Sequence, residues 1–225
     1  MRRVENRSIK NDSYLPKGPV IGPLIIAGVT FKDDSKLIEY RVKDSKQLSP
    51  TKREELATKI KKIAENLEIL VIPATDIDDM RKIMTLNQIE VNAFIKIITK
   101  LKPEICYVDS VDVNEERFGR NINSALSFKT TIISKHKADE IYPIVSAASI
   151  LAKSGREEEV KKIANELENK LNLPLGSGYP ADPITQKFFK TWLDRFGELP
   201  PHTRHSWKTS QKILDEKNVK KLDEF

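Results

Sequence analysis

Apolar residues recur along this chain with two different periods. Short apolar, β-branched runs predict buried strands within residues 18–31, 68–72, 105–108 and 128–134. Apolar residues at helical spacing predict amphipathic helices over residues 50–67, 85–101 and 114–126. Strands that alternate with helices are typical of an α/β fold, in which ligand sites gather outside the carboxyl ends of strands.

A long apolar stretch lies within residues 135–153, KHKADEIYPIVSAASILAK. Its segment 144–152 has only Ser146 and Ser149 as polar side chains, which predicts a helix buried on most of its circumference. Asp139 lies shortly before the predicted start of this helix. Position alone favours helix capping over a chemical role, because Asp is a preferred residue at helix starts.

The rest of the chain predicts a helical carboxyl-terminal part. Helices are expected over residues 156–171, 183–196 and 206–217. Asp182 is expected to cap the second of these and Gly197 to end it. We expect three parts: a poorly ordered basic arm over residues 1–17, an α/β domain over 18–172, and a helical extension over 173–225.

Composition narrows the class of protein. The chain has 225 residues, 39% of them hydrophobic, which is enough for one domain with a sizeable core. It has neither a bilayer-spanning apolar run nor the apolar core of a secretory signal, and its single cysteine, Cys106, fits a reducing compartment. We therefore expect a cytoplasmic monomer without a membrane partner. The net charge of +6 hints at a polyanionic partner such as nucleic acid.

Two aspartates fall just after predicted strands. Asp109 follows the strand over 105–108, and Asp139 follows the strand over 128–134. Carboxylates gathered at one sheet edge suit divalent cations in phosphoryl transfer or phosphodiester hydrolysis. Two such residues are not specific, and the alternative is a strand-end turn Asp with a helix-capping Asp. A third aspartate, Asp112, is expected to be simply solvated.

A few other residues are candidates for contacts with nucleic acid. Lys46, Lys135 and Lys137 are placed to contact phosphates, or are ordinary surface lysines. Tyr179 lies on the glycine hinge GSGYP, where it is available to stack on a base or sugar, or else packs the loop down.

Five sequence motifs together resemble motifs of the ribonuclease HII family. GPVIGPLIIAGV, KDSKQL, YVDSVDVNEERF, HKADEIYPIVSAASILAK and GSGYPADPIT occur in the family's order and span residues 18 to about 212. The resemblance implies a ribonuclease H-like domain with a mixed central sheet flanked by helices, and a helical carboxyl-terminal extension. It also implies an endonuclease that uses Mg²⁺ or Mn²⁺ in a two-metal mechanism, in which the ions activate the attacking water and stabilise the departing 3′-oxygen. Such an enzyme cuts the RNA strand of RNA–DNA hybrids and single ribonucleotides in duplex DNA, leaving 5′-phosphate and 3′-hydroxyl ends.

The family's catalytic site consists of four carboxylates. An adjacent Asp-Glu pair ends its first strand, one Asp ends a later strand, and one Asp precedes the buried helix. The last two match Asp109 and Asp139, which the resemblance makes catalytic metal ligands. It also makes Tyr179 the tyrosine that stacks at the ribonucleotide junction, and Lys46 a lysine near the scissile phosphate.

The first acidic pair of the family is not present here. The family has a short apolar strand followed by Asp-Glu-Ala-Gly-Arg-Gly, where this chain has Ser13-Tyr14-Leu15-Pro16-Lys17-Gly18. Lys17 and Gly18 are what remains of the turn whose backbone reads the substrate's 2′-hydroxyl. Asp12 is one place early, and such a slip turns a strand residue to the opposite face.

Three explanations for this departure are open, in order of preference. Residues 1–17 are an incorrect start or a frame error, or the chain is a paralogue that binds hybrids without cutting them, or Asp12 and Glu5 supply the ligands. We expect a ribonuclease HII-type endonuclease whose activity is weak because Ser13 and Tyr14 replace two carboxylates. The alternative is a non-catalytic RNA–DNA hybrid-binding paralogue.

Overall fold

The computed structural model describes residues 18–42 and 48–222, with the side chains of 18–42 and 48–215. The expected arm over 1–17, with Lys17 in it, lies outside the described residues, as does Lys46.

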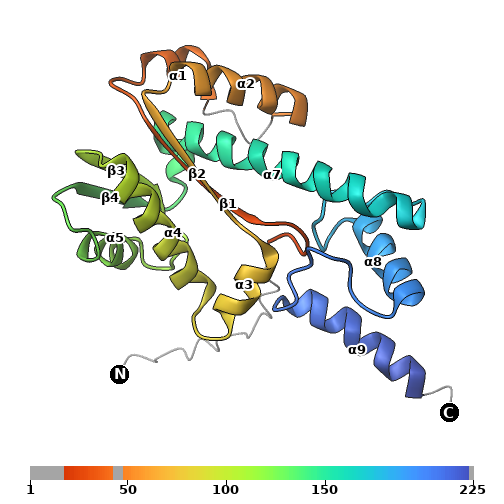
Figure 1. Cartoon of the computed structure of the whole chain (residues 1–225). Coiled ribbons are helices and arrows are strands. Elements are labelled where there is room, and N and C mark those ends of the chain that lie inside the picture. Colours follow the sequence, from red (N-terminus) through yellow and green to blue (C-terminus); the bar gives the residue numbers. More distant parts are fainter. Residues whose placement is uncertain (1–17, 43–47, 223–225) are drawn as a thin grey trace, which may run out of the picture.

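The described strands form two pairs (Figure 1). Strand β1 (Leu24–Thr30) runs antiparallel to β2 (Asn66–Ile72). Strand β3 (Ile105–Asp109) runs parallel to β4 (Thr131–Lys135), with Asp109 opposite Lys135. All four strands were predicted, and one antiparallel with one parallel pair agrees with the mixed sheet expected from the sequence.

Helices surround these strands. Their bounds are α1 Ser35–Glu39, α2 Pro50–Ile63, α3 Ala74–Arg81, α4 Leu86–Leu101, α5 Glu115–Ser124, α6 Ala138–Ile141, α7 Pro143–Leu171, α8 Pro183–Phe196 and α9 Lys208–Leu222. Local signals fix several starts: the Ser49 hydroxyl accepts a hydrogen bond from the Lys52 amide, and Thr85 forms a capping box with Gln88. The sequence did not predict α1, α3 and α6, and it divided α7 into two helices.

Helix α7 crosses β1 at close range. Its 29 residues join the predicted segments 144–152 and 156–171. Gly155, between those segments, faces Ile25 of β1, whose Cδ1 would lie 3.6 Å from a Cβ atom at the glycine. That distance is an ordinary van der Waals contact, so α7 continues over the strand through a glycine that the packing does not require.

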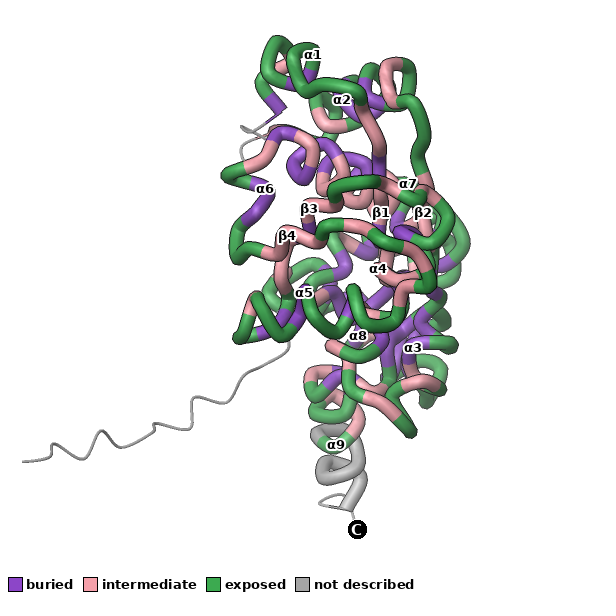
Figure 2. Tube along the Cα trace, turned by 90° about the vertical axis from the view of Figure 1, so that its left-hand side faces the viewer, coloured by how far each residue is buried: buried purple, intermediate pink, exposed green. Residues whose placement is uncertain are grey.

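The two faces of β1 pack against different helices. Leu24 and Ile26 pack in a core cluster with α4, whereas Ala27 and Val29 pack in a cluster with α7. This alternation follows from the two-residue period of a strand. Figure 2 shows buried positions along α4, α7 and the strands between them. Strand β1 is therefore covered by a helix on each face.

Two further clusters complete the described core. One joins α4 and α5 to β3 and β4 through Ile98, Val108 and Phe118. The other packs α8 against the carboxyl-terminal half of α7 through residues such as Leu167 and Phe188. The α/β class and the helical carboxyl-terminal region are as predicted, and the boundary near residue 172 remains a prediction. None of the helices in residues 18–42 and 48–222 is long and apolar enough to cross a membrane.

Candidate active site

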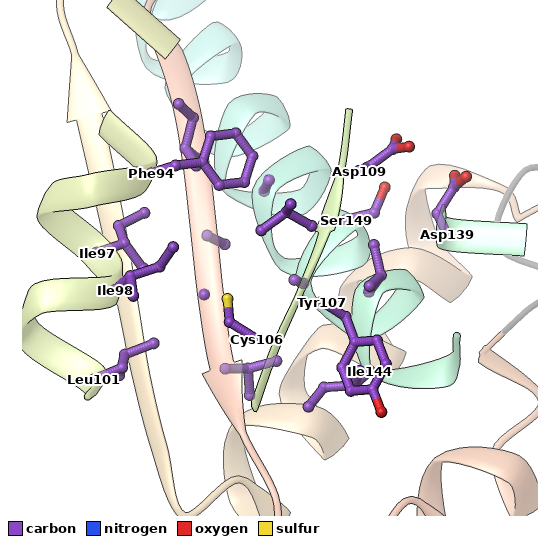
Figure 3. Close-up of a pocket in the computed structure, with 18 of the residues that line it drawn as sticks. Phe94, Ile97, Ile98, Leu101, Cys106, Tyr107, Asp109, Asp139, Ile144 and Ser149 are labelled. Atoms are coloured by element: carbon purple, nitrogen blue, oxygen red, sulfur yellow. The ribbon is translucent and has the colours of Figure 1, made fainter. Parts of the chain in front are cut away.

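Two predicted acids meet at the carboxyl end of β3. Asp109 is the last residue of that strand, and Asp139 lies in the short helix α6 that follows β4. The Ala138 amide donates a hydrogen bond to Asp109 Oδ1 at 3.0 Å, which ties α6 to the end of β3. Figure 3 shows both carboxylates on the same side at this end. The backbone therefore brings the pair together.

Asp139 does not cap the buried helix. The N-cap residue of α7 is Tyr142 and that of α6 is Lys137, so Asp139 occupies the first turn of α6 instead. Lys137 has the left-handed backbone angle φ +54°, which turns the chain sharply from β4 into α6. Only 8% of Asp139 is exposed. The preference for capping that its position suggested is not what the geometry shows.

Lys135, the last residue of β4, forms an ion pair with Glu115. Lys135 Nζ lies 2.7 Å from Glu115 Oε1, and this ion pair raises the pKa of Lys135. Glu115 also accepts a hydrogen bond from the His136 amide. Lys135 thus ties the end of β4 to the start of α5.

Asp112 is buried, so the expectation that it is simply solvated was wrong. It accepts hydrogen bonds from Arg117 Nε, Asn87 Nδ2 and the Asn114 amide, each at 3.0 Å. Arg117, as the strongest of these partners, holds the Asp112 pKa well below its usual range. Asp112 joins α4 to the start of α5. Its bonding explains why it is buried and gives it a structural role.

A cavity of about 260 Å³ opens between β1 and β3. Every residue of both strands lines it, and Asp109 and Asp139 are in its wall. Burial raises the pKa of the Glu90 carboxyl to about 7 and that of the Cys106 thiol to about 12. Most of the residues that line the cavity are apolar, and the carboxylates of Asp109 and Asp139 are exceptions.

Tyr179 is presented on a tightly bonded glycine loop. Gly176 and Gly178 have φ of +79° and +76°, a region that side chains disfavour. The Asp182 carboxylate accepts hydrogen bonds from the Ser177 amide and hydroxyl at 2.7 and 2.8 Å. These hydrogen bonds lower the pKa of Asp182 to about 2. Tyr179 itself is 38% exposed. A rigid loop therefore holds a partly exposed ring.

Two arginines that the sequence did not single out lie beside this loop. The Arg156 guanidinium carbon lies 4.4 Å from the centre of the Tyr179 ring. Arg204 is buried and donates to the carbonyls of Gly22 at 2.9 Å and Pro23 at 2.7 Å. Burial, and then the charge of Arg156, lower the Arg204 pKa to about 10. No periodicity marks either residue, because each is defined by contacts distant in sequence.

Gly18 lies close to the same arginine. A Cβ atom on Gly18 would lie 3.4 Å from Trp207 Nε1 and 3.7 Å from Arg204 Nη1. Two residues further on, the Val20 amide donates to the Gly178 carbonyl at 2.9 Å. The structure thus connects the segments of Gly18 and Tyr179, the two described residues predicted to bind substrate.

Comparisons with known proteins agree on one family. The family model for ribonuclease HII matches residues 16–210. The ribonuclease HII of Pyrococcus abyssi is 42% identical over 201 residues, which cover 88% of this chain and 87% of that protein. The crystal structure of the ribonuclease H2 from Pyrococcus horikoshii OT3 matches with a TM-score of 0.79 and 38% identity, covering 89% of this chain and 93% of that one. The structure of the PCNA:RNase HII complex from Archaeoglobus fulgidus matches with 0.78 and 42%, covering 89% and 95%.

Proposed function

Because this chain belongs to the ribonuclease HII family, we propose that it hydrolyses the RNA strand of RNA–DNA hybrids and cuts at ribonucleotides within duplex DNA. The observation that carries the proposal is the meeting of Asp109 and Asp139 at the end of β3 in a chain of this family. The products would carry 5′-phosphate and 3′-hydroxyl ends. We further propose that the protein acts as a cytoplasmic monomer.

The carboxylate pair suits Mg²⁺ or Mn²⁺, because both ions prefer hard oxygen ligands. Asp109 and Asp139 would hold the ion. Among the side chains described, no group of three or more His, Cys, Asp or Glu residues could hold a metal, so this pair is a partial donor set. Mg²⁺ commonly binds through one or two carboxylates with substrate phosphate oxygens, so the pair would suit one of the two ions of a two-metal mechanism once substrate is bound. When bound, the ion would offset negative charge on the phosphate and acidify a water molecule.

The protein's own contribution is placement. The amide of Ala138 orients Asp109, and the turn at Lys137 sets Asp139 beside it. During hydrolysis a water oxygen bonds to phosphorus, the bond from phosphorus to the 3′-oxygen breaks, and the 3′-oxygen takes a proton. A carboxylate pair fixed before substrate arrives avoids reorganisation during this step.

The substrate would extend from the carboxylates to the tyrosine loop. Tyr179 would stack at the ribonucleotide junction, with Arg156 behind the ring adding positive charge near the phosphates. Lys17 and Gly18 would read the 2′-hydroxyl and Lys46 would contact the scissile phosphate. Contacts with phosphates make binding weaken as salt concentration rises, so hybrid binding measured at two salt concentrations tests this assignment.

We propose that turnover is weak, since Ser13 and Tyr14 stand where the family has two carboxylates. Loss of catalytic groups that act together costs orders of magnitude in rate. The same substitution favours the second candidate, a paralogue that binds hybrids without cutting them. Restoring the acids in the double variant Ser13→Asp, Tyr14→Glu should raise the cleavage rate by about 100-fold or more if the alignment is right. An unchanged rate would count against it.

Cleavage of a DNA duplex with one ribonucleotide, in the presence of Mn²⁺, separates the two candidates. The chain should cut above the background set by Asp109→Asn and Asp139→Asn. Asp79→Asn is the matched control, because it removes a charge from an exposed ion pair with Lys82. Binding without any cleavage above the Asp109→Asn background would instead support the hybrid-binding paralogue.

A further inference from the structure

The segment over residues 18–23, here called the pre-strand segment, is hydrogen-bonded to two distant parts of the chain. Its Val20 amide donates to the carbonyl of Gly178, in the glycine loop, at 2.9 Å. Its Gly22 amide donates to the His202 carbonyl, also at 2.9 Å. The chain between α8 and α9 passes beside the pre-strand segment (Figure 1). The segment therefore connects the glycine loop to the part of the chain that precedes α9.

Arg204 makes several hydrogen bonds to the pre-strand segment. Its backbone amide donates to the Val20 carbonyl at 2.8 Å. Its guanidinium donates to the carbonyls of Gly22 at 2.9 Å and Pro23 at 2.7 Å. Only 3% of Arg204 is exposed, so these hydrogen bonds are largely shielded from water. A planar guanidinium serves two carbonyl groups at fixed angles, which the flexible ammonium of lysine does not. Arg204 thus fixes the path of the pre-strand segment.

Gly18, at the start of the pre-strand segment, also lies against Arg204. The Arg204 guanidinium carbon lies 4.8 Å from the centre of the Trp207 ring, which is buried. A Cβ atom on Gly18 would be in van der Waals contact with both side chains, 3.4 Å from Trp207 Nε1 and 3.7 Å from Arg204 Nη1. One side of Gly18 therefore faces two buried side chains from the carboxyl-terminal part of the chain.

Helix α3 holds the backbone on which Arg204 lies. The Asp78 carboxylate accepts a hydrogen bond from the His205 amide through Oδ2 and one from the Ser206 amide through Oδ1, both at 2.8 Å. These two amides follow Arg204 directly in the sequence. A single carboxylate on α3 therefore fixes the segment that carries the arginine.

The glycine loop packs directly on the pre-strand segment. A Cβ atom at Gly178 would lie 2.9 Å from Ile21 Cγ2, closer than such atoms approach, so glycine permits this contact. Arg156 fixes the loop from the side of α7, because its Nη2 donates to the Ser177 carbonyl at 2.8 Å. The position of Tyr179 relative to the pre-strand segment is therefore set by short contacts on both sides of the loop.

We propose that Arg204 is a positioning residue for ribonucleotide recognition and that Asp78 holds it in place. The inference rests on the proposed function, in which Gly18 reads the 2′-hydroxyl and Tyr179 stacks at the ribonucleotide junction. Arg204 is buried and would not touch the substrate, but it sets the place of Gly18 relative to Tyr179. A hydrogen bond to a hydroxyl weakens steeply when misplaced, whereas attraction to phosphates changes slowly with distance. Loss of Arg204 should therefore reduce the preference for a ribonucleotide more than it reduces binding to DNA.

Binding to two duplexes tests the inference. One DNA duplex carries a single ribonucleotide, the other is all DNA, and fluorescence anisotropy without divalent cations measures both Kd values without cleavage. The parent chain should prefer the ribonucleotide duplex. Arg204→Lys keeps the charge but loses the paired hydrogen bonds to Gly22 and Pro23, so its two Kd values should agree within about twofold. A Kd ratio equal to that of the parent would overturn the proposal.

Asp78→Asn is the second variant, and it tests the proposal from a partly exposed position on α3. Asparagine keeps one acceptor oxygen and loses the other, so the variant should lose part of the preference for the ribonucleotide duplex. Asp79→Asn is the matched control, because Asp79 pairs with Lys82 at an exposed position of the same helix. Equal Kd ratios for these two variants would exclude Asp78 from the arrangement. If Arg204→Lys does not fold, the same result would overturn the proposal as a whole.

A destabilised variant separates positioning from loss of stability. Ile122→Ala removes buried packing in the cluster of α4 and α5. Partial unfolding lowers binding to both duplexes by the same factor, so this variant should keep the Kd ratio of the parent. Circular dichroism gives the folded fraction of each variant. A reduced ratio in Ile122→Ala would show that the ratio follows stability, and would overturn the assignment to Arg204.

Hydrogen exchange of the free protein separates this inference from the proposed function. In Arg204→Lys, amides of the pre-strand segment should exchange at least about tenfold faster, while those of β3 should not change. If they do so and the parent shows no preference for the ribonucleotide duplex, Arg204 holds the segment and it is the proposed recognition that fails. If the parent shows the preference and Arg204→Lys changes neither exchange nor the Kd ratio, the proposed recognition stands and the role of Arg204 is refuted.

Discussion

Glu90 should make the protein less stable above neutral pH. Glu90 lines the cavity between β1 and β3, and burial raises the pKa of its carboxyl from 4.5 to about 7. The positive charge of Arg204 acts in the opposite direction but is the smaller effect. The unfolded chain exposes the carboxyl to water, so the folded state binds this proton more tightly than the unfolded state does.

The size of the effect follows from the two pKa values. Each pKa unit corresponds to about 1.4 kcal/mol, so the difference between 4.5 and about 7 gives an upper limit of about 3.5 kcal/mol. Because the folded pKa is the higher one, the protonated Glu90 carboxyl contributes this amount to the free energy of unfolding below pH 4.5. The contribution is lost as pH rises to about 7. Above that range the cost of the buried charge is constant.

Glu90→Gln removes the charge and keeps the shape. The variant should exceed the parent by about 2–3 kcal/mol in free energy of unfolding at pH 8, and match it at pH 4.5. Urea titrations at several pH values, followed by circular dichroism, measure this difference. Glu55→Gln, at an exposed position on α2, should change stability by less than about 0.5 kcal/mol at either pH. Equal or lower stability of Glu90→Gln at pH 8 would refute the reasoning.

Three further changes test other parts of the structure. Asp182→Ala removes the α8 cap and the bonds to Ser177, and should cost about 1–2 kcal/mol in urea titrations near pH 7. Because the folded pKa of Asp182 is the lower one, this deficit should disappear as pH falls from 3.8 towards about 2. Phe188→Ala empties a fully buried site and should cost about 3–5 kcal/mol by the same assay; a loss below about 1 kcal/mol would contradict its place in the core. Cys106, with its pKa raised to about 12, should react with iodoacetamide at pH 8 at least about 100-fold more slowly in the native protein than in urea, and similar rates would show that it is accessible.

Local signals predicted much of the helical structure. Asp182 and Gly197 bound α8 as the sequence indicated, because a side-chain cap and a left-handed glycine act within one turn of the helix end. Asp109 was correctly placed at a strand end for a similar reason. A short apolar run that ends at a carboxylate mostly indicates a buried strand that ends at that residue.

Contacts between distant segments were not predictable in the same way. The helices α1 and α6 have 5 and 4 residues, too few to show a helical period. The sequence divided α7 because its first half is apolar all round and its second half is not. The change reflects which neighbours cover each half, rather than a break in the helix. Burial of Asp112 depends on Asn87 and Arg117, which no local pattern associates with it.

Strand pairing was the least predictable part of the site. Apolar runs identify strands but do not say which edges pair, since pairing depends on register and on the helices that cover each face. Every described strand was expected, yet the cavity between β1 and β3 was not. It depends on how two strands distant in sequence are placed, which neither apolar run encodes.

Folding and catalytic completeness are separable in this chain. Asp109 and Asp139 are placed by the pairing of β3 with β4, by the Ala138 amide, and by α7, which packs against described residues such as Val29, Leu37 and Ile60. None of these contacts requires carboxylates at positions 13 and 14. A chain that lost those two carboxylates can therefore keep its core and half of its catalytic site intact. For that reason the presence of Asp139 before a buried helix identifies the family but does not by itself establish the activity.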